Sequence, residues 1–237
     1  MTYSVMEISE RPRRGQGGLM RVLGVAGRLV LPVLGLFTVL AVAFFTHDVP
    51  VTEDAFAILA RFDGVPPEAY AWDPRWWPLT WAYLLVPLGF FAIHLTNRAY
   101  GPGLAALQVL VTWSLIGGLV LWVFDAWGDA FTGNPLPPRR MAVSLTLGLV
   151  LGQLTACFFF DRTRGRDWWT APFWGSVFGG LVFVLIVSIG ARGLVGLPWA
   201  PHLVLGFAYQ LAAAIALLVP YYFLRGLIRP APGFGGR

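Results

Sequence analysis

The hydrophobic pattern of this chain consists of long apolar runs that contain no charged residue. Each run reaches about 18 residues or more, which is the length that an α-helix needs to cross the hydrocarbon core of a bilayer. The runs lack the apolar–polar alternation of a membrane β-barrel, so satisfied backbone hydrogen bonding requires helices. The runs are 29–46, 76–93, 99–124, 141–160, 168–191 and 203–224. We therefore predict an all-α polytopic membrane protein with six transmembrane helices.

The segments outside these runs predict the rest of the organisation. Residues 1–18 and 229–237 are polar or rich in Gly, Pro and Arg, and we expect them to be flexible cytoplasmic tails on a transmembrane domain at 19–228. The longest connection, 47–75, has acidic residues ahead of apolar residues at helical spacing. It predicts a short amphipathic helix lying on the outer surface of the membrane.

Composition and charge support this membrane setting. The chain is 57% hydrophobic and only 12% charged, whereas an ordinary soluble domain is about 25% charged, which argues against a soluble enzyme. With the N-terminus inside, twelve of the 17 arginines fall on the cytoplasmic side. The five outside are Arg61, Arg75, Arg139, Arg140 and Arg192. The positive-inside rule then predicts a multi-pass protein of a bacterial inner (cytoplasmic) membrane with both termini in the cytoplasm. This distribution explains the net charge of +5 without a nucleic-acid partner.

Small residues recur at a spacing of four along three of the runs. Lipid tails give no hydrophobic drive between helices, so close backbone contact through small residues has to supply helix association. The pattern predicts a compact bundle in which these faces pack together. The residues are Ser144, Gly148, Gly152 and Ala156, then Gly175 and Gly179, and finally Ala208, Ala212 and Ala216.

No catalytic or metal motif accompanies this framework. The sequence has no GxxxxGK[ST], HExxH or CxxC pattern, so we expect neither an enzyme nor a bound cofactor or metal. The single cysteine, Cys157, lies in an apolar run and is expected to be a small buried residue. His47 and His202 lie at the ends of runs, where surface exposure is the default expectation.

Polar residues within or beside the runs are the candidates for a substrate site. Such side chains usually face the bundle interior, where they either hold helices together or line a polar pathway. For His94, a structural hydrogen bond, a substrate contact and a ligand to a pigment or haem all remain open. The candidate substrate-binding residues are His94, Asn97, Arg98, Gln153, Ser176, Tyr209 and Gln210. No charge lies well inside any run, which is unusual for a pump but compatible with a carrier of a small neutral solute.

Two inner connections carry the most specific pattern. Asn, Gly and Pro at 94–102 predict a tight turn between the second and third helices, and 160–169 is rich in arginine and ends in a Trp pair. Together they resemble the vitamin-uptake transporter family, which includes transporters of queuosine precursors. The matching residues include Leu95, Thr96, Asn97, Arg98, Ala99, Tyr100, Gly101 and Pro102, then Gln153, Asp161, Arg162, Trp168, Trp169, Ser176 and Gly179, and finally Leu217, Leu218, Val219, Pro220 and Tyr221. The resemblance runs from about residue 79 to 224 and implies a six-helix fold for small substrates.

The chain departs from that family at its buried charges. The family usually carries an acid before the inner turn, often one in helix four, one in helix five and a Lys in helix six. These positions are His94, Ala156, Phe183 and Gln210 in this chain. One buried ion left without its partner is costly in hydrocarbon, so the loss of the whole set is physically coherent.

Two hypotheses of function follow. One is a membrane transporter for uptake of a small nucleobase- or vitamin-like solute such as a queuosine precursor, hydrogen-bonded by Asn97, Gln153 and Gln210 and stacked on aromatic rings. The other is a non-transporting accessory or structural subunit of a larger inner-membrane complex. The expected partners are therefore the bilayer and either a small solute or protein subunits. A polar cavity around the three amides would favour transport, and a solid interior with an apolar outer groove that holds another protein would favour the subunit.

Overall fold

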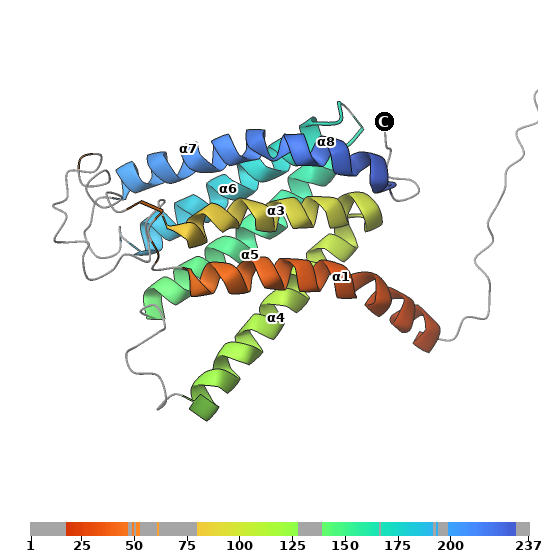
Figure 1. Cartoon of the computed structure of the whole chain (residues 1–237), viewed down its shortest axis with the longest axis horizontal. Coiled ribbons are helices and arrows are strands. Elements are labelled where there is room, and N and C mark those ends of the chain that lie inside the picture. Colours follow the sequence, from red (N-terminus) through yellow and green to blue (C-terminus); the bar gives the residue numbers. More distant parts are fainter. Residues whose placement is uncertain are drawn as a thin grey trace, which may run out of the picture.

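The fold is all-α over the residues that the structure describes. The structure is a computed structural model of the whole chain. It describes residues 18–46, 49, 51–52, 61, 80–127, 139–165, 167–191, 193 and 199–230. The helices are α1 (Gly18–Phe45), α3 (Trp81–Tyr100), α4 (Pro102–Trp127), α5 (Arg139–Arg162), α6 (Thr170–Ala191), α7 (Ala200–Ala216) and α8 (Leu218–Leu227). Helices α7 and α8 meet at Leu217 and continue in one direction, as one long rod (Figure 1).

Five helical segments are long and apolar enough to cross a membrane, which makes this a multi-pass membrane protein. They lie in α1, α4, α5, α6 and the combined α7–α8 rod. The sequence predicted six, and the helix that is not among the five is α3. Its last turns carry His94, Asn97 and Arg98, which lower its mean hydropathy. Because α3 packs against α1, α4, α5 and α6, protein surrounds these polar side chains.

Two predicted boundaries were wrong for a shared reason. Helix α1 begins at Gly18, well before residue 29, so Arg28 lies within it. Arginine is a good helix former whose long side chain can extend toward the interface, so a charge does not end a helix. The predicted turn at 94–102 is likewise helical through Tyr100, and Gly101 alone separates α3 from α4. The predicted amphipathic helix within 47–75 and nearly all of the two tails lie outside the described residues.

Helix α3 occupies the middle of the bundle (Figure 1). On one side it faces α5, α6 and the α7–α8 rod, and on the other it contacts α1 and the start of α4. The hydrophobic core joins residues from these helices, including Leu36, Phe90, Ile93, Phe183 and Val184. Helix α4 crosses α1 and its second half then extends away from the other helices (Figure 1).

The small-residue face is buried on α5 but exposed on α7. On α5, the face that contains Gly148, Gly152 and Ala156 is buried, mostly against α6. On α7 the predicted alanine face is exposed, and the buried face has the same spacing but different residues. These buried residues are His202, Gly206, Gln210 and Ala214. The expectation that His202 is exposed was therefore also wrong, because its ring hydrogen-bonds the Ser188 hydroxyl at 2.8 Å.

Candidate functional site

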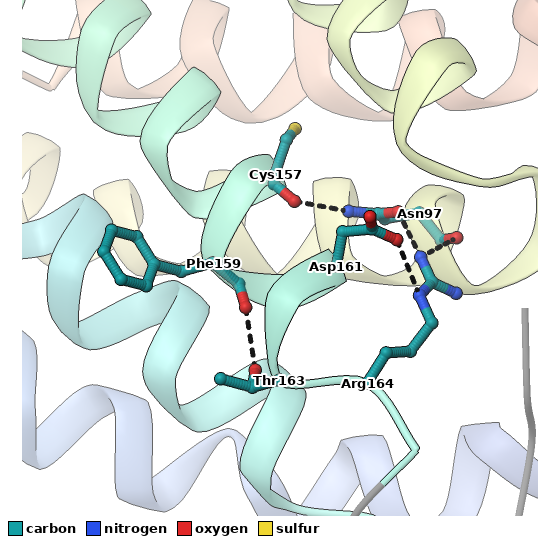
Figure 2. Close-up of polar contacts among 6 residues, drawn as sticks. All are labelled: Asn97, Cys157, Phe159, Asp161, Thr163 and Arg164. Carbon is teal, nitrogen blue, oxygen red and sulfur yellow. Dashed lines mark hydrogen bonds and ion pairs between the residues drawn. The ribbon is translucent and has the colours of Figure 1, made fainter.

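The two inner segments at 94–102 and 160–169 meet in a hydrogen-bonded network (Figure 2). The Asn97 side-chain amide donates to the backbone carbonyl of Cys157 at 3.1 Å. Arg164 donates to the Asn97 backbone carbonyl at 2.9 Å and also to its side-chain oxygen. The Asp161 carboxylate accepts from Arg164 at 3.1 Å. Both ends of the Asn97 amide are therefore occupied, and they tie α3 to α5 and to the loop that follows α5.

Local backbone geometry explains why these groups meet. Gly101 has a φ of 87°, which favours glycine, and its N–H donates to the Asn97 carbonyl at 2.9 Å to end α3. After α5 ends, Arg164 donates to α3, and Gly165, with a φ of 88° that favours glycine, turns the chain directly after it. Partial burial lowers the pKa of the Arg164 guanidinium, while the Asp161 carboxylate acts in the opposite direction. An arginine remains protonated under such conditions, so the network keeps its positive charge.

Arg98 extends the network to the last helix. Its Nε donates to the Ile228 carbonyl at 3.0 Å and its Nη2 to the Arg225 carbonyl at 3.2 Å. These carbonyls lie at the C-terminus of α8, where unpaired acceptors and the helix dipole favour a cation. Arg98 thus connects the end of α3 to the end of α8.

The other motif residues surround this network without entering it. Thr96 donates its hydroxyl to the Ala92 carbonyl of its own helix at 3.2 Å. Tyr100 and Trp169 are exposed, as is Arg162, whose guanidinium lies 5.5 Å from the centre of the Phe158 ring. Tyr100, Arg162 and Trp169 therefore face outward rather than toward a common site, whereas Thr96 is buried but bonds only within its own helix.

His94 forms a separate buried polar contact between α3 and α6. Its Nε2 is 2.9 Å from the Ser176 hydroxyl, and its ring stacks on Phe160 with centroids 5.1 Å apart. Gly175 provides the room, because a β-carbon there would lie 2.6 Å from the His94 Cε1 atom. The other ring nitrogen, Nδ1, has no hydrogen-bond partner among the described residues. His94 and Ser176 were predicted as separate candidates, and in the structure they are hydrogen-bonded to each other.

The two candidate glutamines are buried near the middle of the bundle. The Gln153 carbonyl oxygen accepts from the Trp113 indole at 2.9 Å, which joins α5 to α4. Its Nε2 faces Gly89 of α3, where a β-carbon would be 3.5 Å away. Gln210 of α7 packs over Gly180 of α6, with a β-carbon there 3.1 Å from the Gln210 Cβ.

Phe90 lies on the same level as these two amides. A β-carbon on Gly179, next to Gly180, would lie 3.0 Å from the Phe90 ring, and Phe90 follows Gly89 in the chain. Phe90 is itself fully buried. Gln153 and Gln210 are therefore connected through Phe90 and its neighbours on α3 and α6.

An aromatic cluster adjoins Gln210 one turn along α7. The Tyr83 ring lies 5.6 Å from Phe183 and 6.0 Å from Tyr209, measured between ring centroids. Tyr209 donates its hydroxyl to the Leu84 carbonyl at 3.0 Å, and the Tyr83 hydroxyl faces Gly206. Sequence analysis missed Tyr83 and Trp113. The spacing of Tyr83, Phe90 and Asn97 in steps of seven would have placed Tyr83 on the buried face of α3.

Several buried polar atoms in this interior lack partners. Among the described residues they are Tyr83 Oη, His94 Nδ1, Gln108 Oε1, Thr112 Oγ1, Gln153 Nε2 and Gln210 Nε2. A buried polar atom without a hydrogen bond is costly, so each marks a place where a further partner would be stabilising. Gln153 and Gln210 are at most 2% exposed, so no open cavity reaches them in this conformation.

Comparisons with protein-family models, with curated proteins and with solved structures give no match. Among the described residues, no group of three His, Cys, Asp or Glu side chains is placed to hold a metal ion. Sequence and structure together establish a multi-pass, all-α membrane protein whose closed interior contains several buried polar side chains.

Proposed function

We propose that this protein is a membrane carrier with the fold of the vitamin-uptake transporter family, and that it takes up a small, uncharged, nucleobase- or vitamin-like solute such as a queuosine precursor. In this proposal α3 is a sixth span and both termini lie in the cytoplasm, as the arginine distribution indicates. The observation that carries the proposal is the set of unpartnered amide and hydroxyl groups of Gln153, Gln210 and Tyr83, buried beside aromatic rings.

The four positions at which the chain departs from the family support the resemblance. His94 and Ala156 both approach Gly175, since a β-carbon there would lie 2.6 Å from the His94 ring and 3.1 Å from the Ala156 carbonyl. Phe183 lies two turns further along α6, and Gln210 packs beside Gly180 between them. His94, Ala156 and Phe183 therefore lie on the side of α6 that carries Gly175, and Gln210 lies on the side that carries Gly180. Loss of the whole set of charges leaves no single ion unpaired in this interior.

The chemistry of the unpartnered groups indicates the class of solute. Gln153 and Gln210 each have a free amide N–H, and Tyr83 has a hydroxyl that both donates and accepts. These groups match the carbonyl and ring-nitrogen acceptors of a flat heterocycle. Aromatic rings such as Tyr83 and Phe183 provide stacking surfaces for it. Because no charged side chain is buried among the described residues at this level, a neutral solute is favoured over an ion.

The inner-end network would act as the closed inner gate of this carrier. Arg164 holds Asn97, and Arg98 holds the end of α8, so three helix ends are fixed together. The closed interior then corresponds to a state in which the solute site is shut off from the cytoplasm. Opening would exchange these hydrogen bonds for contacts with water, which is a small net change in free energy per bond.

An uptake assay tests the proposal directly. Cells that lack their own uptake route would express the full chain and receive a radiolabelled deazapurine precursor of queuosine. We expect accumulation well above that of cells carrying an empty vector. Gln153→Leu and Gln210→Leu should each lower uptake by at least about tenfold, because each removes a hydrogen bond to the solute.

Thr112→Val provides the matched control. Thr112 also has a buried, unpartnered hydroxyl, but it lies on α4, one turn from Gln108, which faces α1. The change keeps the shape of the side chain, and uptake should stay within about twofold of the wild type. Membrane abundance of each variant would be measured by immunoblotting. Uptake equal to that of the empty vector would reject the carrier proposal for this solute class.

A second candidate function is an accessory subunit of a larger membrane complex. The specific observation in its favour is α1, whose N-terminal half has few contacts within the chain: Leu31 is 80% exposed and Met20 65%. The closed interior around Gln153 and Gln210 also favours this role, since an open polar cavity there would have supported transport. Extraction in a mild detergent followed by native gels would separate the two, since a subunit should migrate with partners and a carrier as the chain alone or with copies of itself.

A further inference from the structure

Among the described residues, arginines outnumber carboxylates at the end of the bundle where α3, α5 and α8 finish: they are Arg98, Arg162, Arg164, Arg225 and Arg229, against Asp161 and Asp167. Arg98, Arg164 and Arg225 all lie close enough to the buried Tyr221 hydroxyl to interact with it electrostatically. Asp161 pairs with Arg164, and Arg98 is engaged by backbone carbonyls. The Arg225 guanidinium makes no hydrogen bond or ion pair with any other residue that the structure describes. It is therefore a cation with its donors available.

Aromatic rings hold this guanidinium in place. It lies 4.9 Å from the centre of the Trp168 ring and 4.7 Å from that of Tyr222, and these two rings pack edge to face at 5.2 Å. A guanidinium above a ring keeps its N–H groups in its own plane, so they remain free to meet an acceptor at its edge. This planar fork matches two oxygens of a phosphate group.

An apolar surface leads away from this cation along the α7–α8 rod. Tyr222, Val219 and Ile215 are 48%, 61% and 55% exposed and are spaced three or four residues apart, as Tyr222 is from Arg225. Residues at this spacing are neighbours on a helix surface. The face therefore begins with a cation near the end of the span Ala200–Leu227 and continues as hydrocarbon toward its middle.

We propose that Arg225, supported by Trp168 and Tyr222, binds the phosphodiester headgroup of an anionic phospholipid, with the acyl chains along Val219 and Ile215. A free phosphate ion would use the cation but not the apolar face, whereas a lipid uses both. Basic residues beside a membrane span are typical sites for anionic headgroups. The proposal requires only that the protein lies in a bilayer, and it is independent of whether it transports a solute.

Native mass spectrometry of the purified full chain in a non-ionic detergent tests this site. The protein would be titrated with phosphatidylglycerol, with phosphatidylcholine of the same acyl chains, and with inorganic phosphate. We expect phosphatidylglycerol to bind at least about tenfold more tightly than phosphatidylcholine, and inorganic phosphate not to displace it. Equal binding of the two lipids, or displacement by inorganic phosphate, would overturn the assignment.

Substitutions at two arginines, Arg225 and Arg162, test whether the headgroup binds at this site. Arg225→Gln should weaken phosphatidylglycerol binding by about tenfold, and Arg225→Lys, which keeps the charge but loses the planar fork, should fall between it and the wild type. Arg162→Gln is the control, because Arg162 is an exposed arginine at the same end that lies over Phe158. It should change binding by less than about twofold. If the Gln variants at 225 and 162 behaved alike, the headgroup would not be bound at Arg225.

Discussion

Two halves of this molecule use glycine in opposite ways. In the half built from α3, α5, α6 and α7, a β-carbon on Gly152 or Gly179 would lie 2.7 Å from the carbonyl oxygen of the other. In the half built from α1 and α4, a β-carbon on Gly27 or Gly117 would meet nothing within 4 Å. Figure 1 shows the same contrast, since α5 and α6 run together while α4 departs from the bundle. A glycine therefore indicates close packing only where the helix register places it opposite another backbone.

Alanine substitution at these glycines should have the largest effect and should differ most between the two halves. Gly152→Ala would push a methyl group into the Gly179 carbonyl, and separating the two helices should lower the free energy of unfolding by about 3 kcal/mol. Gly117→Ala should leave it unchanged or raise it by up to about 1 kcal/mol, because alanine favours a helix. Both are measured by titrating detergent-solubilised protein with dodecyl sulfate and following helicity by circular dichroism. Equal effects at the two sites would refute the described contact of α5 with α6.

Asn97→Ala should have the next largest effect. The change removes the donor to the Cys157 carbonyl and the side-chain acceptor of Arg164, and it leaves this guanidinium partly buried with fewer partners. Unsatisfied buried groups of this kind cost about 2 kcal/mol of unfolding free energy. Arg162→Gln serves as its control and should cost less than about 0.5 kcal/mol, since that side chain is exposed. The same titration compares them, and an Asn97→Ala effect as small as that of the control would contradict the network in Figure 2.

These examples show what the sequence could and could not predict. The apolar runs predicted the membrane-crossing helices, because lipid requires the backbone to satisfy its own hydrogen bonds and the runs lack the alternation of a barrel. They did not predict that residues 94–100 are helical, since Asn97 and Arg98 looked like loop residues until their partners were known. Those partners, Arg164 and the end of α8, lie 67 and about 130 residues away in the chain. Local patterns carry no information on such distant pairs.

The candidate site shows the same limit. Each of His94, Ser176, Gln153 and Gln210 was identified by its polarity within or beside an apolar run. Their pairing depends on the register of one helix against another, which polarity does not encode. The face of α7 is the clearest case, because its alanines and its polar residues repeat with the same spacing of four. Only the structure shows that Gln210 lies on the buried face and that the alanines are exposed.

Two serine-to-alanine substitutions compare the two halves through smaller expected changes in the free energy of unfolding. Ser176→Ala removes the partner of the buried His94 ring, 2.9 Å away, and should lower the free energy of unfolding by about 1 kcal/mol. Ser114→Ala is the matched change on α4, where the serine is exposed, and should stay within about 0.5 kcal/mol of the wild type. Should Ser114→Ala prove the more damaging of the two in the detergent titration, the α1–α4 half would be more tightly packed than described.

The smallest effect is expected at the one side-chain hydrogen bond that the structure describes between α1 and α4. Gln108 donates to the Pro32 carbonyl at 2.7 Å, but its own Oε1 has no partner among the described residues. Gln108→Leu would lose the hydrogen bond to Pro32, but it would also remove the cost of burying an unpaired Oε1. The free energy of unfolding should therefore fall by only about 0.5 kcal/mol. The mobility of α1 should respond more than its stability, and hydrogen exchange around Pro32 should become faster while that of α5 and α6 stays constant. Faster exchange in α5 would instead mean that the two halves unfold as one unit.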